Sequence, residues 1–409
     1  MAHSVKKSWK IFKNSTNYLA CGSSTGSKIP AIEDAEPAAI VRGKGCRVWD
    51  ADGNEYIDYR NGLGPVTLGY AISEINDAIK AQLDNGIIYG HPHILEGKAA
   101  EALTEVIPCA ERVRFLKTGG EAIAACIKIA RAATGRNKIV QCGYNGWLNT
   151  LSAPGGTVPA GIANSQPLKG IPKAISDLHK SLPWADNAAW EKLFAEEGKE
   201  IAAIVVASNY TDMEKGKNFF PFLRKLTQKY GSLMIVDEIV TGFRLAMGGA
   251  HEYFNFMPDM AVFAKGCANG MPISAYLGKA ELIESARSIG ISSTYGGETL
   301  SLASLKATVA FYKKNNVIAH IWKNSGRLWP EVNKLFENYK ISASFKGLSV
   351  CPQLVFEGDA AKLSVPFFKN CYLNGVSLYN VSYVNYSHKD KDIDETIEKI
   401  GRSIESCLK

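Results

Sequence analysis

The sequence predicts an α/β protein, with a large domain built on a mostly parallel sheet and a smaller α+β domain. Three observations support this fold class. The chain has 409 residues, enough for one large and one smaller domain. A hydrophobic content of 46% with 21% charged residues is typical of globular proteins. Short apolar runs alternate with helical patterns, as in parallel sheets covered on both faces, and they occupy residues 113–116, 138–141, 203–206, 233–236, 261–264 and 273–277.

The segments before and after these runs predict the smaller domain. Residues 38–60 indicate strands around the turn Asp52-Gly53-Asn54, which is a hairpin signal. A long helical stretch over about 300–316 leads into a final segment that mixes helices with strands such as 354–356. We therefore expect an N-terminal segment over 1–62 that joins the small domain, a large domain over 63–308 and a C-terminal small domain over 309–409.

The composition argues against several classes of protein. No apolar stretch approaches the roughly 20 residues that span a bilayer, and the N-terminus lacks the apolar core of a signal peptide. Nine cysteines without paired or metal-type spacing favour a reduced, cytoplasmic chain. The net charge of +7 is dispersed, which predicts a solvated surface and no nucleic-acid site. His91 and His93 are the only close histidine pair and flank a proline, so we expect no metal site.

One acid and one lysine give the strongest chemical signal. Asp237 directly follows the apolar run 233–236, and Lys265 directly follows 261–264. Because ligands bind beyond the carboxyl ends of parallel strands, both side chains are expected at the binding edge of the sheet. The chemistry of pyridoxal phosphate (PLP) requires such a pair. The lysine amine forms a Schiff base with the cofactor aldehyde and later carries a proton, while the acid keeps the pyridine nitrogen protonated.

A glycine-rich turn predicts where the cofactor phosphate binds. Thr118-Gly119-Gly120 lies between the run 113–116 and an amphipathic helix that begins near Glu121 and stops at Gly135. Glycines at a helix N-terminus expose backbone N–H groups, and the helix dipole favours an anion there. Such a turn is a weak signal alone, and it indicates a phosphate site only in combination with Asp237 and Lys265.

These segments resemble the cofactor signature of the class III aminotransferases. Residues 237–244, DEIVTGFR, are similar to D-E-[VI]-x-T-G-x-R, and Lys265 is followed by the glycine-rich turn 266–272. Residues 48–59, VWDADGNEYIDY, resemble the family's N-terminal meander. Within the class the likeness is strongest to glutamate-1-semialdehyde 2,1-aminomutases. The resemblance implies a fold-type I PLP transferase with a seven-stranded-type sheet, in which Ile239 packs against one face of the cofactor ring.

Further motifs extend the resemblance to the phosphate, the ring and a partner subunit. Residues 118–122 are similar to the family's S-G-[TS]-E-A, with Gly120 in place of the usual hydroxyl. Tyr144 resembles the aromatic residue of Y-H-G that stacks on the cofactor, and Asn145 replaces the histidine. Thr294 matches the threonine of T-[FY]-x-G-N-P, which binds the phosphate of the neighbouring subunit. The resemblance therefore implies a homodimer with shared active sites.

The substrate half of the site departs from the aminomutase pattern. The segment 22–30 lacks the family's carboxylate-binding arginine, and Lys28 is the only cation nearby. The segment near Ala207 corresponds to the substrate-facing wall of the site in many class III enzymes, and it lacks their glutamate. The hydroxyl-bearing residues of 22–30 favour a polyhydroxylated acceptor such as a keto-sugar. We expect substrate contacts from Ser24, Lys28, Asn145 and Glu298.

The leading hypothesis is a PLP-dependent aminotransferase that moves an amino group from a donor such as glutamate to a carbonyl acceptor. The main alternative is intramolecular transfer of the glutamate-1-semialdehyde aminomutase type, which uses the same cofactor. Racemisation or decarboxylation on that cofactor is a further alternative. A non-catalytic protein of the same fold is opposed by the intact Lys265 and Asp237.

Overall fold

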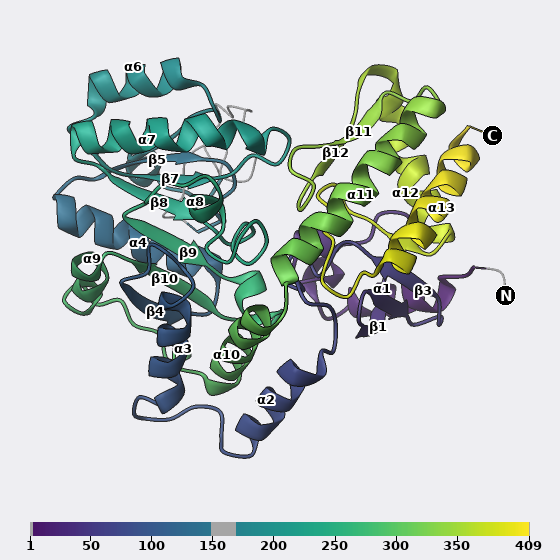
Figure 1. The fold of residues 1–409 in the computed structure, drawn as a ribbon, viewed down its shortest axis with the longest axis horizontal. Helices are drawn as coiled ribbons and strands as arrows, with labels where there is room; N and C mark the ends of the chain where they lie inside the picture. Colours follow the sequence, from purple (N-terminus) through teal and green to yellow (C-terminus); the bar gives the residue numbers. More distant parts are fainter. Residues whose placement is uncertain (1–2, 149–168, 409) are drawn as a thin grey trace. The chain divides into compact units, whose positions relative to one another are not determined.

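The computed structural model describes residues 3–148 and 169–408, and the chain divides into two compact units (Figure 1). Unit 1 consists of residues 1–72 and 319–409, and unit 2 consists of residues 73–318. The domain boundaries expected at 62/63 and 308/309 remain a prediction. The compact units divide the chain at 72/73 and 318/319.

Unit 2 is built on a seven-stranded, mostly parallel sheet, which confirms the predicted fold class. Four neighbouring pairs are parallel, from β6 through β5, β7 and β8 to β9, whereas β10 is antiparallel to both of its neighbours. The short strand β6 is polar, and no apolar run predicted it. In sheet order the strands are β4 (Arg112–Leu116), β10 (Ser274–Gly278), β9 (Met260–Phe263), β8 (Leu233–Asp237), β7 (Ile201–Ala207), β5 (Lys138–Cys142) and β6 (His179–Ser181).

Helices cover both faces of this sheet, as the apolar strands require (Figure 1). Along β7, Ala203 and Val205 pack in one cluster with α4 (Gly119–Thr134), while Ile204 and Val206 pack in the other with α6 and α7. The remaining α-helices of unit 2 are α2 (Ser73–Leu83), α3 (Ile94–Thr104), α5 (Lys173–Ser176), α6 (Asn187–Glu197), α7 (Gly216–Tyr230), α8 (Ala250–Tyr253), α9 (Ala280–Glu284) and α10 (Thr299–Lys314).

Unit 1 contains the predicted N-terminal meander. The strands β1, β2 and β3 pair antiparallel in order, and β13 adds to β3 in parallel. Helices α11 and α13 share an apolar core with these strands and with the separate hairpin β11–β12. The elements are α1 (Lys6–Ser15), β1 (Ile40–Lys44), β2 (Arg47–Asp50), β3 (Glu55–Asp58), α11 (Val317–Asn338), β11 (Ala343–Lys346), β12 (Gln353–Phe356), α12 (Ser364–Leu373), β13 (Val376–Ser377) and α13 (Asp390–Cys407).

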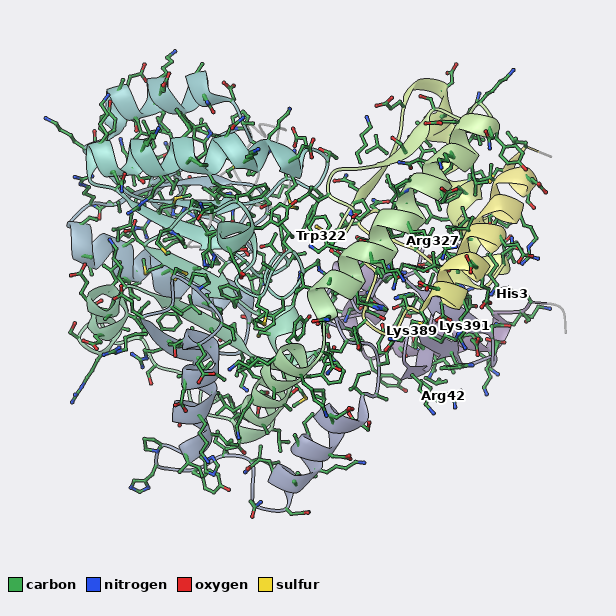
Figure 2. All side chains as sticks on the ribbon, viewed as in Figure 1. His3, Arg42, Trp322, Arg327, Lys389 and Lys391 are labelled. Carbon is green, nitrogen blue, oxygen red and sulfur yellow. The ribbon has the colours of Figure 1, made fainter. Side chains whose placement is uncertain are left out.

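Positive charge on unit 1 is distributed over several elements. Figure 2 labels Arg42 on β1, Arg327 on α11 and Lys391 on α13. The Arg42 guanidinium lies 3.9 Å from the ring centre of Trp49, and Arg327 forms an ion pair with Asp394. Within the described residues, no helix is long and apolar enough to cross a membrane.

Candidate active site

Asp237 and Lys265 lie at the carboxyl ends of two adjacent parallel strands. Asp237 is the last residue of β8 and pairs in register with Val262 of β9. Lys265 follows β9 by two residues and opens a short 3₁₀ turn, Lys265–Ala268. Its backbone φ is +48°, in the left-handed region that a side-chain-bearing residue seldom adopts. Such conformations concentrate at functional sites.

The two side chains are held in a low-dielectric environment. Burial raises the pKa of Asp237 to about 7, against a hydrogen bond from the Ile239 N–H at 3.0 Å and the attraction of Lys265, both of which lower it. Burial lowers the pKa of Lys265 to about 8, although the charge of Asp237 opposes this shift. A substantial fraction of the lysine amine is therefore neutral near physiological pH, as a nucleophile or base requires.

The predicted phosphate turn begins α4. Thr118 is the N-cap of this helix, and its hydroxyl accepts the Glu121 N–H at 3.3 Å. Glu121 completes a capping box by accepting the Thr118 N–H at 2.7 Å. The preceding amides of Gly119 and Gly120 belong to the first turn of the helix, whose N–H groups have no partner within the helix. These amides are available for an anion.

Ile239 connects the turn to the acid. A Cβ atom added at Gly119 would lie 2.3 Å from Cδ1 of Ile239, so a larger residue at position 119 would force the isoleucine side chain to move. The Ile239 N–H also donates to Asp237, as described above. The structure therefore brings together Asp237, Ile239 and Gly119, all three of which the sequence predicted as cofactor-binding.

Tyr144 and Asn145 follow β5 at the same end of the sheet. The Tyr144 side chain is 56% exposed, and its pKa is raised by partial burial and by the negative charge of Asp237. Asn145 is buried and donates from Nδ2 to the carbonyl oxygens of Cys142 at 3.1 Å and Gly143 at 3.2 Å. These bonds hold the loop that carries Tyr144. The predicted substrate contact of Asn145 stays a prediction.

Thr294 and Glu298 lie in the loop before α10. Thr294 is exposed, as a residue that contacts a neighbouring subunit would be in a single chain. Glu298 is the N-cap of α10, and its carboxylate forms an ion pair with Lys117 at 2.8 Å. Lys117 directly precedes the phosphate turn, and the sequence patterns did not indicate it.

Ser24 and Lys28 belong to unit 1, where both are exposed. Lys28 lines a cavity of about 380 Å³ that Arg60 also lines. The expectation that Lys28 is the only cation nearby was therefore wrong. Arg60 is 32 residues further along the chain, and folding of the meander places it at this cavity. The Arg60 guanidinium donates to Glu36 at 3.0 Å and to the Ser27 carbonyl at 3.2 Å.

The residues of unit 2 fit a PLP molecule. A buried acid suits the ring nitrogen, a lysine with a lowered pKa suits the aldehyde, and free amides at a helix N-terminus suit the phosphate. Asp237, Lys265 and the turn 118–120 would hold these three groups. Ile239, packed against Gly119, supplies an apolar surface for the ring.

Comparisons with known proteins agree with this assignment. The family model described as aminotransferase class-III matches residues 30–403. A glutamate-1-semialdehyde 2,1-aminomutase of Persephonella marina is 33% identical over 431 aligned positions, covering 99% of each chain. A solved transaminase with PLP bound has a TM-score of 0.92 at 21% identity, with 100% of this chain and 99% of that chain covered.

A solved glutamate-1-semialdehyde aminomutase of Pseudomonas aeruginosa has a TM-score of 0.84 at 18% identity, covering 98% of this chain and 95% of that chain. At these identities, the two structural matches show a shared fold alone. The match to the family model and the aminomutase of Persephonella marina extend the likeness to the sequence over nearly the whole chain.

Proposed function

Because the chain belongs to the aminotransferase class-III family, we propose that it moves an amino group from a donor such as glutamate to the carbonyl group of a second molecule. The family consists of PLP-dependent enzymes, so the predicted family, enzyme class and cofactor are confirmed. The observation that carries the proposal is the pairing of Lys265 with Asp237 at the ends of two adjacent parallel strands.

PLP, when bound, supplies an electron sink for negative charge that develops on the substrate carbon. Lys265 would hold the cofactor through its amine. The Nζ of Lys265 would also act as the base that moves a proton at the substrate carbon, a role typically worth roughly 10²–10⁴-fold in rate. Asp237 would keep a proton on the ring nitrogen, and the turn 118–120 would bind the phosphate through its N–H groups.

The test of this assignment is chemical labelling of the lysine. The purified protein, reconstituted with PLP and reduced with borohydride, should carry the label on the peptide that contains Lys265. Lys265→Ala should carry none. Lys279, which is paired with Asp259 at 2.7 Å, offers a matched control as Lys279→Ala. A label on another lysine, or no PLP retained by the wild type, would refute the proposal.

A homodimer is part of the proposal, and an exposed apolar surface of unit 2 supports it. Five large apolar side chains from the end of α2 to the start of α3 are 40% to 69% exposed: Leu83, Ile87, Ile88, Tyr89 and Ile94. The Thr299 N–H donates to the Ile87 carbonyl at 2.9 Å, which ties this segment to the start of α10, five residues after Thr294. A surface of this kind suits a second copy of the chain.

Mixed dimers test the shared site. Lys265→Ala and Thr294→Ala subunits should each be inactive alone. After subunit exchange, one of the two sites in each mixed dimer is intact, so about half of the wild-type activity per mixed dimer should return. No recovery, despite exchange verified with differently tagged subunits, would contradict a site that contains Thr294 from the neighbour.

For the acceptor we propose a hydroxylated carbonyl compound such as a keto-sugar. The segment 22–30 supports this choice, because it carries the hydroxyls of Ser23 and Ser24 and no arginine. Groups that both donate and accept hydrogen bonds suit hydroxyls better than they suit a second carboxylate.

The second candidate is intramolecular transfer, and the names of the relatives favour it. The relative from Persephonella marina is a glutamate-1-semialdehyde 2,1-aminomutase. Two measurements separate the candidates: kcat/KM for keto-sugars with glutamate as donor, and conversion of the semialdehyde without any added keto acid. Efficient semialdehyde conversion alone would replace the aminotransferase proposal with the aminomutase.

A further inference from the structure

Glu298 stands where the family motif has asparagine, and both of its carboxylate oxygens are engaged. Oε1 accepts the Leu300 N–H at 2.6 Å. Oε2 accepts the Ser301 hydroxyl at 2.6 Å and lies 2.8 Å from Nζ of Lys117. The side chains of Lys117 and Glu298 are 17% and 12% exposed, so the pair is largely shielded from solvent. Burial raises the pKa of Glu298, but the bonds from Lys117 and Ser301 lower it by more, which keeps the carboxylate ionised at neutral pH.

Lys117 links Glu298 to the phosphate turn. Its own N–H and that of Thr118 both donate to Oε2 of Glu121, at 3.2 Å and 2.7 Å. The Thr118 carbonyl oxygen accepts the hydroxyl of Ser274 on β10 at 2.8 Å. The backbone at 117–118 is therefore fixed from the α4 side and from the sheet, and the Lys117 side chain extends this fixation to α10.

The same end of α10 also reaches the turn that follows Lys265. Ser304, two turns into the helix from Glu298, is buried and donates its hydroxyl to the Ala268 carbonyl oxygen at 2.8 Å. Ser301 Oγ lies 3.2 Å from the Pro272 carbonyl oxygen. The first two turns of α10 thus contact the segment 268–272 through serines and the phosphate turn through Glu298.

We propose that Glu298, acting with Lys117, is a positioning residue that sets the spacing between the phosphate turn 118–120 and Lys265. The inference rests on the proposed function, because it concerns how PLP is held. A ligand attached at Lys265 and bound through its phosphate at 118–120 has a fixed length. Even a small change in the distance between Lys265 and the turn 118–120 therefore weakens binding of the phosphate. This role differs from the substrate contact that the sequence predicted for Glu298.

The experiment compares two ligands that differ only in the phosphate. Apo protein is titrated with PLP and with pyridoxal, and the dissociation constants are measured from absorbance for the wild type, Glu298→Gln, Lys117→Met and Lys117→Arg. Glu197→Gln is the control, because Glu197 on α6 is an acid of similar exposure that pairs with Lys138 of β5 and with Lys180 of β6. We expect Glu298→Gln and Lys117→Met to weaken PLP about tenfold and pyridoxal less than about twofold. Lys117→Arg should retain most of the PLP affinity.

Each other outcome overturns the inference. Equal weakening of PLP and pyridoxal would indicate a general loss of structure, and melting temperatures measured in parallel would show it. Unchanged PLP affinity with a raised KM for substrate would restore the predicted substrate contact. Wild-type protein that does not bind PLP on Lys265 would instead refute the proposed function, so the two failures are distinguishable.

Discussion

Replacing Asp237 with asparagine should remove a pH-dependent loss of stability from the cofactor-free protein. Burial raises the pKa of Asp237 from 3.8 to about 7 in the folded state. Between these two values the folded state binds the proton more tightly than the unfolded chain does. The stabilising contribution of the protonated Asp237 is therefore complete below pH 3.8 and is lost as the pH rises through about 7. Asparagine has no proton to lose and removes this dependence.

The magnitude follows from proton linkage. One proton changes the free energy of unfolding by about 1.4 kcal/mol per pH unit while it is bound in one state only. From pH 5.5 to 7, wild-type apo protein should lose about 2 kcal/mol relative to Asp237→Asn. In the wild type, Lys265 titrates above this window, because burial lowers its pKa only to about 8 against the opposing effect of Asp237.

The assay is urea unfolding of the apo proteins at pH 5.5, 6, 6.5 and 7, at one salt and one protein concentration. Asp77→Asn is the control for removing one acid, because Asp77 is a solvent-exposed residue of α2 whose side chain is 72% exposed. The difference between Asp237→Asn and wild type should rise steadily across the series, while the control curve should run parallel to wild type. Parallel curves for Asp237→Asn would refute the reasoning that burial raises the pKa of Asp237.

Three further predictions follow from the same geometry. Gly119→Ala places a Cβ atom 2.3 Å from Cδ1 of Ile239, so the isoleucine side chain must rotate. PLP titration should show weaker binding, and urea unfolding should show a loss of about 0.5–1.5 kcal/mol. The backbone φ at Gly249 is +80°, and a Cβ atom added there would lie 2.2 Å from Oε2 of the buried Glu238. Gly249→Ala should therefore lower the free energy of unfolding in urea by at least about 1 kcal/mol. The rate at which PLP becomes attached to Lys265 should rise as the pH passes through about 8, measured by stopped-flow absorbance, because the amine is then neutral. A rate that stays flat between pH 7 and 9 would contradict that lowered pKa.

The sequence by itself determined the sheet and the two central residues of the site. Apolar runs bounded by helical patterns identified six of the seven strands, because strands covered on both faces need apolar side chains throughout. The placement of Asp237 and Lys265 followed from the same pattern, since Asp237 ends β8 and Lys265 follows β9 by two residues. The local motif also determined the turn at Thr118, because an N-cap and a capping box involve residues only three positions apart.

Only the tertiary structure decided the contacts between residues distant in sequence. The pairing of Lys117 with Glu298 joins positions 181 residues apart, and no local pattern indicates which charged side chains will meet. Arg60 shares a cavity with Lys28 because the meander folds back over the N-terminal segment. The pKa values of Asp237 and Lys265 likewise depend on how completely the surrounding chain excludes water. Propensity and periodicity act over a few neighbouring residues, whereas burial and ion pairing are properties of the packed fold.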